Sequence, residues 1–239
     1  MTRLVFGDGG RDARSFKELA GELGAKIDTD EVGNTYAANT DETGYTLIGS
    51  HLDSVIEGGR YDGVAGVMAG LMVMRWAKED GIRIPLRSGR SGCEESSNFG
   101  CCTIGSGLIT HEVYKQDIGH LMSKDGESLE SIFEHRGLTL HPKKISGLRR
   151  YLELHIEQGK VLEECKTQVG IVGTIAGPVR YRVYLRGMAE HSGATPMDMR
   201  SDALCAVRRS FWRWRRSESG NLRTSRWRRW AWFRTIRMF

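Results

Sequence analysis

The feature that most constrains the fold is a strand–loop–helix unit within residues 45–72. The apolar run YTLIGS (45–50) predicts a short buried strand that ends directly before His51. A loop rich in glycine and acidic residues, HLDSVIEGGRYDG, follows it. Apolar residues then recur on one face and predict a helix of about five turns: Val64, Val67, Met68, Leu71 and Met72. This order of elements is typical of α/β proteins.

Other segments extend this pattern to an α/β fold with a mixed sheet flanked by helices. The further elements expected are a helix over 11–23, two short strands within 26–39 around a turn at Gly33-Asn34, a strand after 81–86, a strand within 148–159, strands over 167–177 and 179–187, and a helix that starts near Asp198. We expect a catalytic domain over residues 1–177 and the start of a second, α+β domain over residues 178–207.

The charge of the chain is unevenly distributed. The net charge of +5 arises in the segment 208–239, which holds 11 arginines, one glutamate and five of the six tryptophans. The remainder carries 24 Lys or Arg against 29 Asp or Glu, which is typical of a mildly acidic soluble protein. No run of 18 apolar residues predicts a membrane span, and residues 1–10 lack the apolar region of a signal peptide. The five cysteines show no framework spacing, so we expect unpaired thiols, a cytoplasmic protein and no membrane partner.

Histidines and acids cluster at the ends of predicted strands. They are His51, Asp53, Asp62, Glu94, Glu95, His155 and His191. Each alone is more typical of a structural or surface residue, but α/β enzymes build their sites at strand ends and in glycine-rich loops. Imidazole and carboxylate are the ligands expected of zinc, and they also suit cobalt, manganese or nickel. The sequence therefore predicts a metal site.

This residue set suits a pair of metal ions. A carboxylate can bridge two cations, and two cations about 3.5–4 Å apart can activate one water molecule and polarise one carbonyl. An adjacent acid pair such as Glu94-Glu95 suits a division between a metal ligand and a general base. Asp53 is a candidate for orienting a ligand, because a ligating histidine usually donates its other N–H to a partner.

Four motifs in order resemble the hydantoinase/carbamoylase family of amidases, within the M20-like metallopeptidase superfamily. They are HLDSVIEGGRYDGVAGVMAGL, CEESSNFG, LELHIEQG and GMAEHSGATPMDMRSDAL, and the resemblance runs to about residue 207. The family contains N-carbamoyl-L-amino-acid hydrolases, β-ureidopropionases and allantoate amidohydrolases. The resemblance implies hydrolysis of a carbamoyl or ureido C–N bond by a hydroxide held between two divalent metal ions, Zn²⁺ first.

The resemblance also implies a role for each residue. His51 binds the first metal, Asp62 bridges both, and Glu95 and His155 bind the second. Glu94 acts as the general base and Asp53 lies behind His51. Two further residues, Gln158 and His191, contact the substrate. His191 reaches it or the oxyanion from a lid that also forms the homodimer in intact relatives.

The sequence departs from the family in three places. RSGRSG (87–92) has no apolar residue and is not expected to form a buried strand, although the family has one there. Residues 208–239 replace an expected amphipathic helix with Arg/Trp-rich sequence. We interpret both stretches as reading-frame errors in a GC-rich gene. Residues 192–239 contain no histidine, so a further ligand expected for the first metal is missing. We therefore expect a truncated chain, weaker metal binding and doubtful activity.

Alternatives remain open at this point. The Arg/Trp-rich tail could bind nucleic acid or a membrane, although it has no RNA-binding motif and we expect no nucleic-acid partner. Within the superfamily, a peptidase or deacylase activity is a second alternative, and an inactive fragment is a third. The sequence does not choose among carbamoyl amino acids, allantoate and ureidopropionate, or between zinc and manganese.

Overall fold

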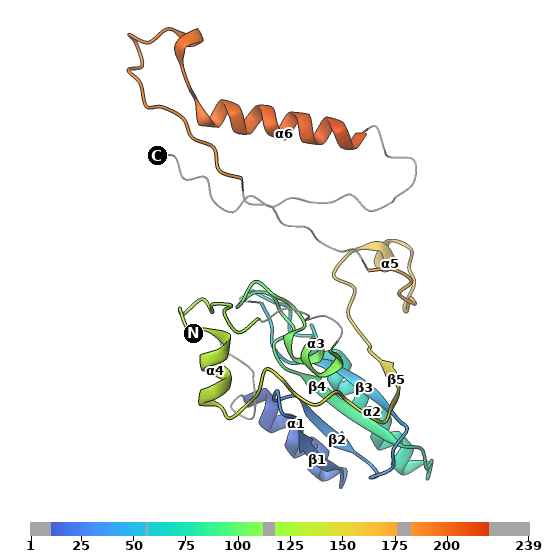
Figure 1. Ribbon diagram of the computed structural model, residues 1–239. Helices are drawn as coiled ribbons and strands as arrows, with labels where there is room; N and C mark the ends of the chain where they lie inside the picture. Colours follow the sequence, from blue (N-terminus) through green and yellow to red (C-terminus); the bar gives the residue numbers. More distant parts are fainter. Residues whose placement is uncertain (1–10, 56, 112–117, 176–182, 220–239) are drawn as a thin grey trace. The chain divides into compact units, whose positions relative to one another are not determined.

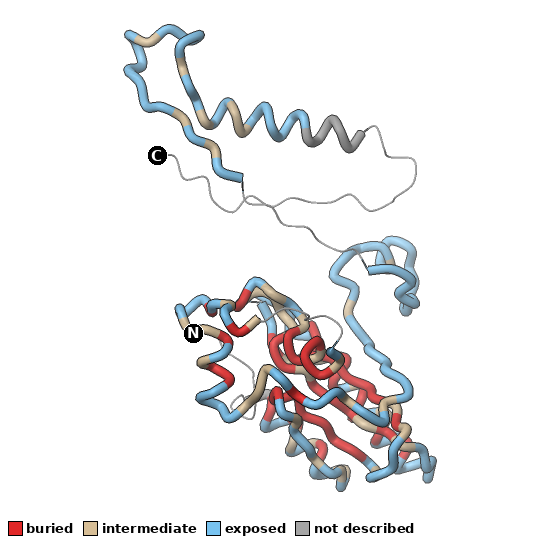
Figure 2. Tube along the Cα trace, in the orientation of Figure 1, coloured by how far each residue is buried: buried red, intermediate tan, exposed pale blue. Residues whose placement is uncertain are grey.

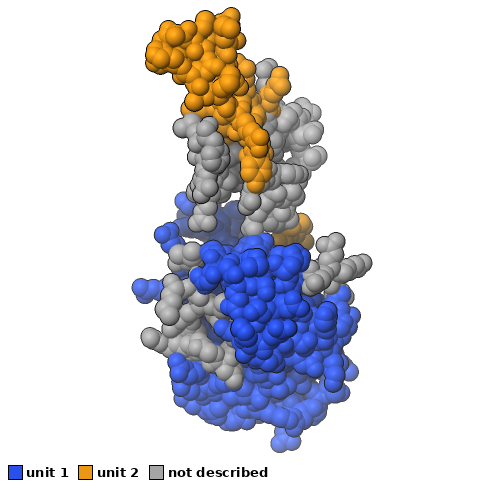
Figure 3. Space-filling view, turned by 60° about the vertical axis from the view of Figure 1, so that its left-hand side comes forward, with its two compact units in different colours: residues 1–166 blue, residues 167–239 orange. Residues whose placement is uncertain are grey.

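The computed structural model describes residues 11–55, 57–111, 118–175 and 183–219 (Figure 1). The chain divides into two compact units, residues 1–166 and 167–239, which Figure 3 distinguishes by colour. Each unit is described by itself below.

The first unit is built on a mixed sheet of five strands in the order β1-β2-β4-β3-β5. The strands are β1 (Lys26–Thr29), β2 (Thr35–Ala38), β3 (Tyr45–His51), β4 (Leu86–Ser91) and β5 (Leu148–Leu152). β1, β2 and β4 pair antiparallel, whereas β3 runs parallel to both β4 and β5. The expected α/β fold with a mixed sheet is confirmed.

The hairpin of β1 and β2 follows from its turn residues. Asp30 Oδ1 accepts hydrogen bonds from the backbone N–H groups of Val32 and Asn34, and Gly33 takes a φ of 86° that favours glycine. Helix α1 (Arg11–Glu22) precedes this hairpin and is followed by Gly24 at a φ of 71°, the expected helix stop. The predictions for residues 11–39 are confirmed.

Alternation along the strands sends side chains to two separate cores. On one face, Ala37 and Ile48 pack with α1 and with α2 (Val64–Glu79). On the other, their neighbours Tyr36 and Leu47 pack with α3 (Ile104–Thr110) and α4 (Leu129–His135). Figure 2 shows the buried residues concentrated on the central strands and on the helix α3. The sheet is therefore the middle of three layers.

Strand β4 corrects the expectation that residues 87–92 do not form a buried strand. It lies between β2 and β3, and Ser88, Gly89 and Arg90 are buried. The backbone ladder supplies its hydrogen bonds whatever the side chains are. Small residues also help, because Gly89 lies opposite Gly49 on β3, where an added Cβ would overlap the Gly89 carbonyl oxygen. The expectation was wrong because it relied on side-chain hydrophobicity alone.

The two arginines of β4 lie in different surroundings. The Arg87 guanidinium lies 3.8 Å from the centroid of the Tyr45 ring, a cation–π contact. Arg90 is only 1% exposed, so its charge is taken out of water. Burial of a charge costs free energy even when the group has a partner.

The described part of the second unit lacks the predicted strands. Residues 167–175 and 183–187 form none, and residues 176–182 lie outside the described residues. A strand needs a partner for its N–H and C=O groups, and none of the described residues pairs with these segments. The helix expected near Asp198 begins later. A short 3₁₀ turn, η2 (Met197–Met199), comes first, and α6 (Ala203–Ser219) begins where Asp202 Oδ1 accepts from Leu204 N and Cys205 N.

Helix α6 continues through residues 208–219 of the Arg/Trp-rich segment. Among the described residues, no helix is long and apolar enough to cross a membrane.

Candidate metal centre

Three parallel strands deliver the candidate ligands to one edge of the sheet. His51 is the last residue of β3, Glu94 and Glu95 follow the end of β4, and His155 follows β5. Asp62 comes from the loop between β3 and α2. The carboxyl ends of parallel strands meet at the same edge, which is where open α/β sheets hold their ligands. The topology thus gathers residues that are up to 104 positions apart in the sequence.

The carboxylate of Asp62 lies against two imidazole rings. The ring centroids of His51 and His155 are 6.0 Å apart. Asp62 Oδ1 lies 3.9 Å from His51 Nε2 and 3.2 Å from His155 Nε2. His51 and Asp62 are buried, whereas His155 is about one-third exposed. Ligand atoms about 2.0–2.2 Å from a tetrahedral zinc lie roughly 3.3–3.6 Å apart, so the spacing is close to that of a metal site.

Backbone carbonyls fix which nitrogen of each ring faces Asp62. His51 Nδ1 lies 2.8 Å from the carbonyl oxygen of Asp53, and His155 Nδ1 lies 2.8 Å from that of Ile156. A carbonyl only accepts, so each Nδ1 carries a hydrogen and donates it. In the neutral rings each Nε2 is then a bare acceptor directed at the Asp62 carboxylate, as in metal-ligating histidines.

This arrangement passes a direct test for a cation. Asp62 Oδ1 is a buried oxygen that has no hydrogen-bond partner among the described residues. Buried polar atoms without partners are costly, and two acceptors facing a carboxylate repel it. A cation among His51 Nε2, His155 Nε2 and Asp62 Oδ1 removes both costs. The residues present therefore fit a divalent metal, and His51, Asp62 and His155 form one group that could hold it.

A second group of possible ligands contains His51, Glu94 and Glu95. Glu94 Oε2 lies 3.7 Å from His51 Nε2. Burial is the largest effect on both glutamates and raises the pKa of each carboxyl group. His51 opposes this rise at both residues, whereas the Glu94 charge adds to it at Glu95. The two groups share His51, whereas the sequence-based assignment shared Asp62 and placed Glu95 with His155.

Asp53 supports both sides of the site in a way the sequence did not reveal. Its carbonyl oxygen, rather than its carboxylate, orients His51. Its carboxylate accepts hydrogen bonds from the backbone N–H of Glu94 at 3.2 Å and of Glu95 at 2.9 Å. Asp53 therefore links the histidine loop to the acid pair.

Gly63 permits the close approach of the loop to His51. Its φ is 69°, a conformation that L side chains rarely adopt. An added Cβ would lie 2.6 Å from His51 Nδ1, well inside van der Waals contact. A glycine is thus required after Asp62, because the backbone takes a positive φ and because no room exists for a side chain.

The two predicted substrate-binding residues lie in different units. Gln158 Nε2 donates to Asp62 Oδ2 at 2.8 Å, so its amide belongs to the same cluster. His191 lies in the second unit and is described there alone. It is exposed, and its Nδ1 accepts from Gly193 N and Ala194 N at 3.1 Å each, which leaves Nε2 directed elsewhere.

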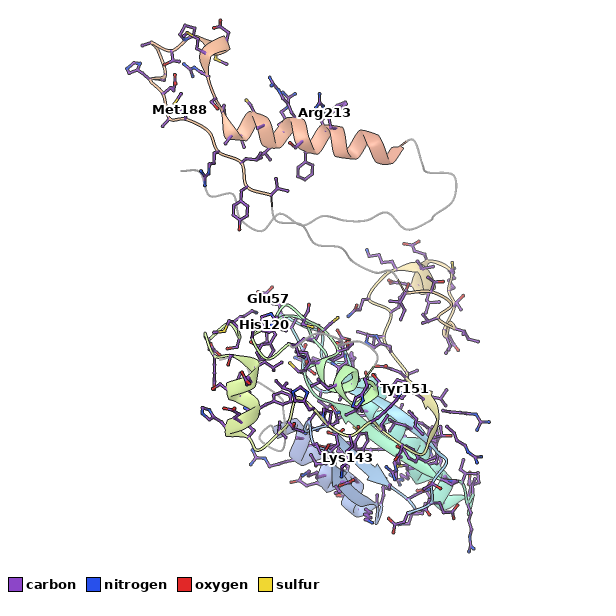
Figure 4. All side chains as sticks on the ribbon, viewed as in Figure 1. Glu57, His120, Lys143, Tyr151, Met188 and Arg213 are labelled. Carbon is purple, nitrogen blue, oxygen red and sulfur yellow. The ribbon has the colours of Figure 1, made fainter. Side chains whose placement is uncertain are left out.

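A side-chain bridge between β3 and β5 was missed by the sequence analysis. The paired register ends at Ile48 and Leu152, yet Ser50 Oγ donates to Glu153 beyond it. Tyr151, labelled on β5 in Figure 4, donates to Glu153 Oε2 at 2.9 Å. These bonds join the strand ends that carry His51 and His155. The sequence signal for this bridge was the two-residue spacing of Glu153 and His155, since residues two apart in an extended segment point to the same face.

Known proteins are similar to this chain in sequence and in fold. The chain is 34% identical over 218 residues to the allantoate amidohydrolase of Bacillus subtilis and 35% identical over 222 residues to the N-carbamoyl-L-amino acid amidohydrolase of Geobacillus stearothermophilus. Each alignment covers 87% of this chain and 53% of the relative. The crystal structure of a hydantoinase/carbamoylase family amidase from Burkholderia ambifaria matches with a TM-score of 0.67 and 31% identity, over 93% of this chain and 56% of that one.

The matching relatives are amidohydrolases and the matching solved structure is a hydantoinase/carbamoylase family amidase, so the resemblance expected from the sequence is confirmed. No family model matches the sequence. The chain spans about half the length of the curated relatives it matches.

Proposed function

We propose that this chain hydrolyses a C–N bond of an N-carbamoyl amino acid or a related ureido acid such as allantoate. The observation that carries the proposal is the buried Asp62 Oδ1, which lacks a hydrogen-bond partner among the described residues and faces two imidazole nitrogens. The names of the relatives support both substrate classes, because allantoate and N-carbamoyl amino acid amidohydrolases match equally well.

The metal ligands we propose are His51, Asp62, Glu95 and His155. They would hold two divalent ions, with zinc first and manganese, cobalt or nickel as alternatives, since imidazole and carboxylate suit all four. When bound, such ions act as Lewis acids and make a water molecule acidic enough to ionise near neutral pH.

Glu94 is proposed as the general base. Its carboxylate is half-buried 3.7 Å from His51 Nε2, and burial raises its pKa toward the range that suits proton transfer at neutral pH. It takes a proton from the attacking water and returns it to the departing nitrogen. The products are an amino acid, ammonia and carbon dioxide when the substrate is an N-carbamoyl amino acid.

The remaining residues are proposed to orient these groups and the substrate. Asp53 holds the backbone of Glu94 and Glu95 and orients His51. Gln158 and His191 are assigned to the substrate. Residues 178–207 are proposed as the beginning of a lid that also forms a homodimer.

Metal analysis combined with an ammonia-release assay tests the proposal. Purified protein is expected to retain divalent metal and to release ammonia from an N-carbamoyl amino acid, allantoate or ureidopropionate. Asp62→Asn is expected to lose both properties, because it removes the charge that faces the two histidines. Asp41→Asn is the matched control, since Asp41 is exposed and pairs only with Lys26 among the contacts described for it. Equal metal content in the parent and in Asp62→Asn would contradict the proposed centre.

A further inference from the structure

The backbone segment 92–95, which carries the acid pair, is hydrogen-bonded through both its C=O and its N–H groups. The carbonyl groups of residues 92–94 accept hydrogen bonds from the first two residues of α3 and from the residue that precedes this helix. The donor–acceptor pairs are Gly105 N to Gly92 O at 3.0 Å, Ile104 N to Cys93 O at 3.0 Å and Thr103 N to Glu94 O at 2.7 Å. This segment is thus fixed by more than its own strand.

The N–H groups of the same segment bond to side chains. Asp53 accepts from Glu94 N and Glu95 N, as described above. The backbone N–H of Gly92 donates to Asn34 Oδ1 at 2.9 Å. Asn34 comes from the β1–β2 hairpin, 58 residues before Gly92. An element that contributes no candidate ligand therefore holds the exit of β4.

Asn34 is itself rigidly held. It is 1% exposed, and its Nδ2 donates to Asp30 Oδ2 at 2.8 Å and to Gly105 O at 3.2 Å. Asp30 also accepts from the Tyr36 hydroxyl at 2.9 Å. Both ends of the Asn34 amide thus have partners, which fixes the position of Oδ1.

We propose that Asn34 is a positioning residue for the Glu94-Glu95 pair, acting through Gly92. The inference rests on the proposed metal centre. Supporting residues behind metal ligands typically change metal affinity by about 10–100-fold, because a ligand displaced by a fraction of an ångström coordinates poorly. Removal of the Asn34 amide frees Gly92 N and loosens the segment two residues before Glu94.

Asn39 directly follows β2 and provides an exposed control for the buried Asn34. Asn39 has the same amide and also bridges to β4, with Leu86 N donating to its Oδ1 at 2.9 Å and its Nδ2 donating to Ile84 O at 2.9 Å. Asn39 holds the entry of β4, whereas Asn34 holds the exit that leads to the acid pair. A general effect of hairpin stability on the sheet would act through both residues.

The test compares Asn34→Ala and Asn39→Ala in the full chain by two measurements. In a Co²⁺ titration followed by the visible absorption bands of the ion, Asn34→Ala is expected to weaken affinity about 10–100-fold. Asn39→Ala is expected to stay within about twofold of the parent. In hydrogen–deuterium exchange without metal, Asn34→Ala is expected to increase the exchange rate of the backbone amides of residues 92–95. Asn39→Ala is expected to increase that of residues 84–87.

Each outcome decides between the two proposals. Equal Co²⁺ affinities in both variants, or unchanged exchange of residues 92–95 in Asn34→Ala, overturns the role of Asn34. A parent chain that binds no Co²⁺ overturns the proposed centre instead. Hydrogen–deuterium exchange then still tests whether Asn34 holds residues 92–95, because it is measured without metal. If Asn34→Ala does not fold, the near-isosteric Asp30→Asn variant takes its place, with Asp28→Asn on the exposed strand β1 as its control. The same order of effects is then expected, and equal behaviour of that pair overturns the proposal.

Discussion

The two units of this chain contain similar apolar patterns but bury them very differently. In residues 13–166, two clusters of buried side chains lie on opposite faces of the sheet. In the second unit, no residue of 167–175 and 183–213 is buried, and Ile171 is 99% exposed. Alternating apolar residues therefore specify a strand only when a neighbouring strand supplies its hydrogen bonds and a facing layer covers its side chains.

The largest expected difference between the units concerns their isoleucines. Ile104→Ala, at a fully buried position, should lower the free energy of unfolding by about 2–5 kcal/mol, because it removes buried surface and leaves a cavity. Ile171→Ala should change it by less than about 0.5 kcal/mol. Urea denaturation measures both. A substantial loss in Ile171→Ala would show that residues 167–175 are packed in solution.

The buried charge in β4 gives the next effect. Arg90→Met should lower the free energy of unfolding by about 1–3 kcal/mol, because it removes one member of a buried polar interaction and leaves the groups around the guanidinium without compensation. Arg209→Met on the exposed part of α6 should change stability by less than about 0.5 kcal/mol. The midpoints of denaturation in urea compare the two variants.

A gain of stability in Arg90→Met would support the interpretation of residues 87–92 as a reading-frame error. Resequencing of the gene tests that interpretation directly, and it applies equally to residues 208–239. A clean read in the present frame at both places would reject it. A destabilised Arg90→Met variant would instead show that the arginine contributes to the fold.

Glycine substitutions sharpen the comparison at the candidate site. Gly63→Ala should cost about 1–3 kcal/mol, because its φ is positive and the new Cβ would contact the His51 ring. It should also lower the bound metal measured by elemental analysis. Gly173→Ala in the second unit should leave both quantities unchanged, since nothing lies within 4 Å of a Cβ there. Retained metal in a folded Gly63→Ala variant would argue against the geometry of this loop.

The smallest effect is expected from deleting the Arg/Trp-rich segment 208–239. The full chain should bind RNA weakly and without sequence preference, and this binding should disappear as salt rises, because it reflects only neutralised phosphates. Filter binding at low and physiological salt, with and without the segment, measures the difference. Sequence-specific binding that persists at physiological salt would give the tail a function of its own.

Local sequence determined much of the first unit. The helical spacing of residues 64–72, the turn at Gly33-Asn34 and the apolar run of 45–50 each gave the correct element, because these patterns depend on neighbours along the chain. The identity of the candidate ligands also came from the sequence, since imidazole and carboxylate at strand ends are chemically specific.

Only the tertiary structure decided the relations among these elements. It placed the polar strand β4 in the centre of the sheet, because backbone pairing does not depend on side-chain polarity. It left the apolar segments at 167–175 and 183–187 without strands, because no described residue pairs with them. It also assigned the Asp53 carboxylate to the backbone of Glu94 and Glu95, and the amide of Asn34 to Gly92. Such contacts join residues that are 41–58 positions apart in the chain, and a local sequence pattern carries no information about that distance in space.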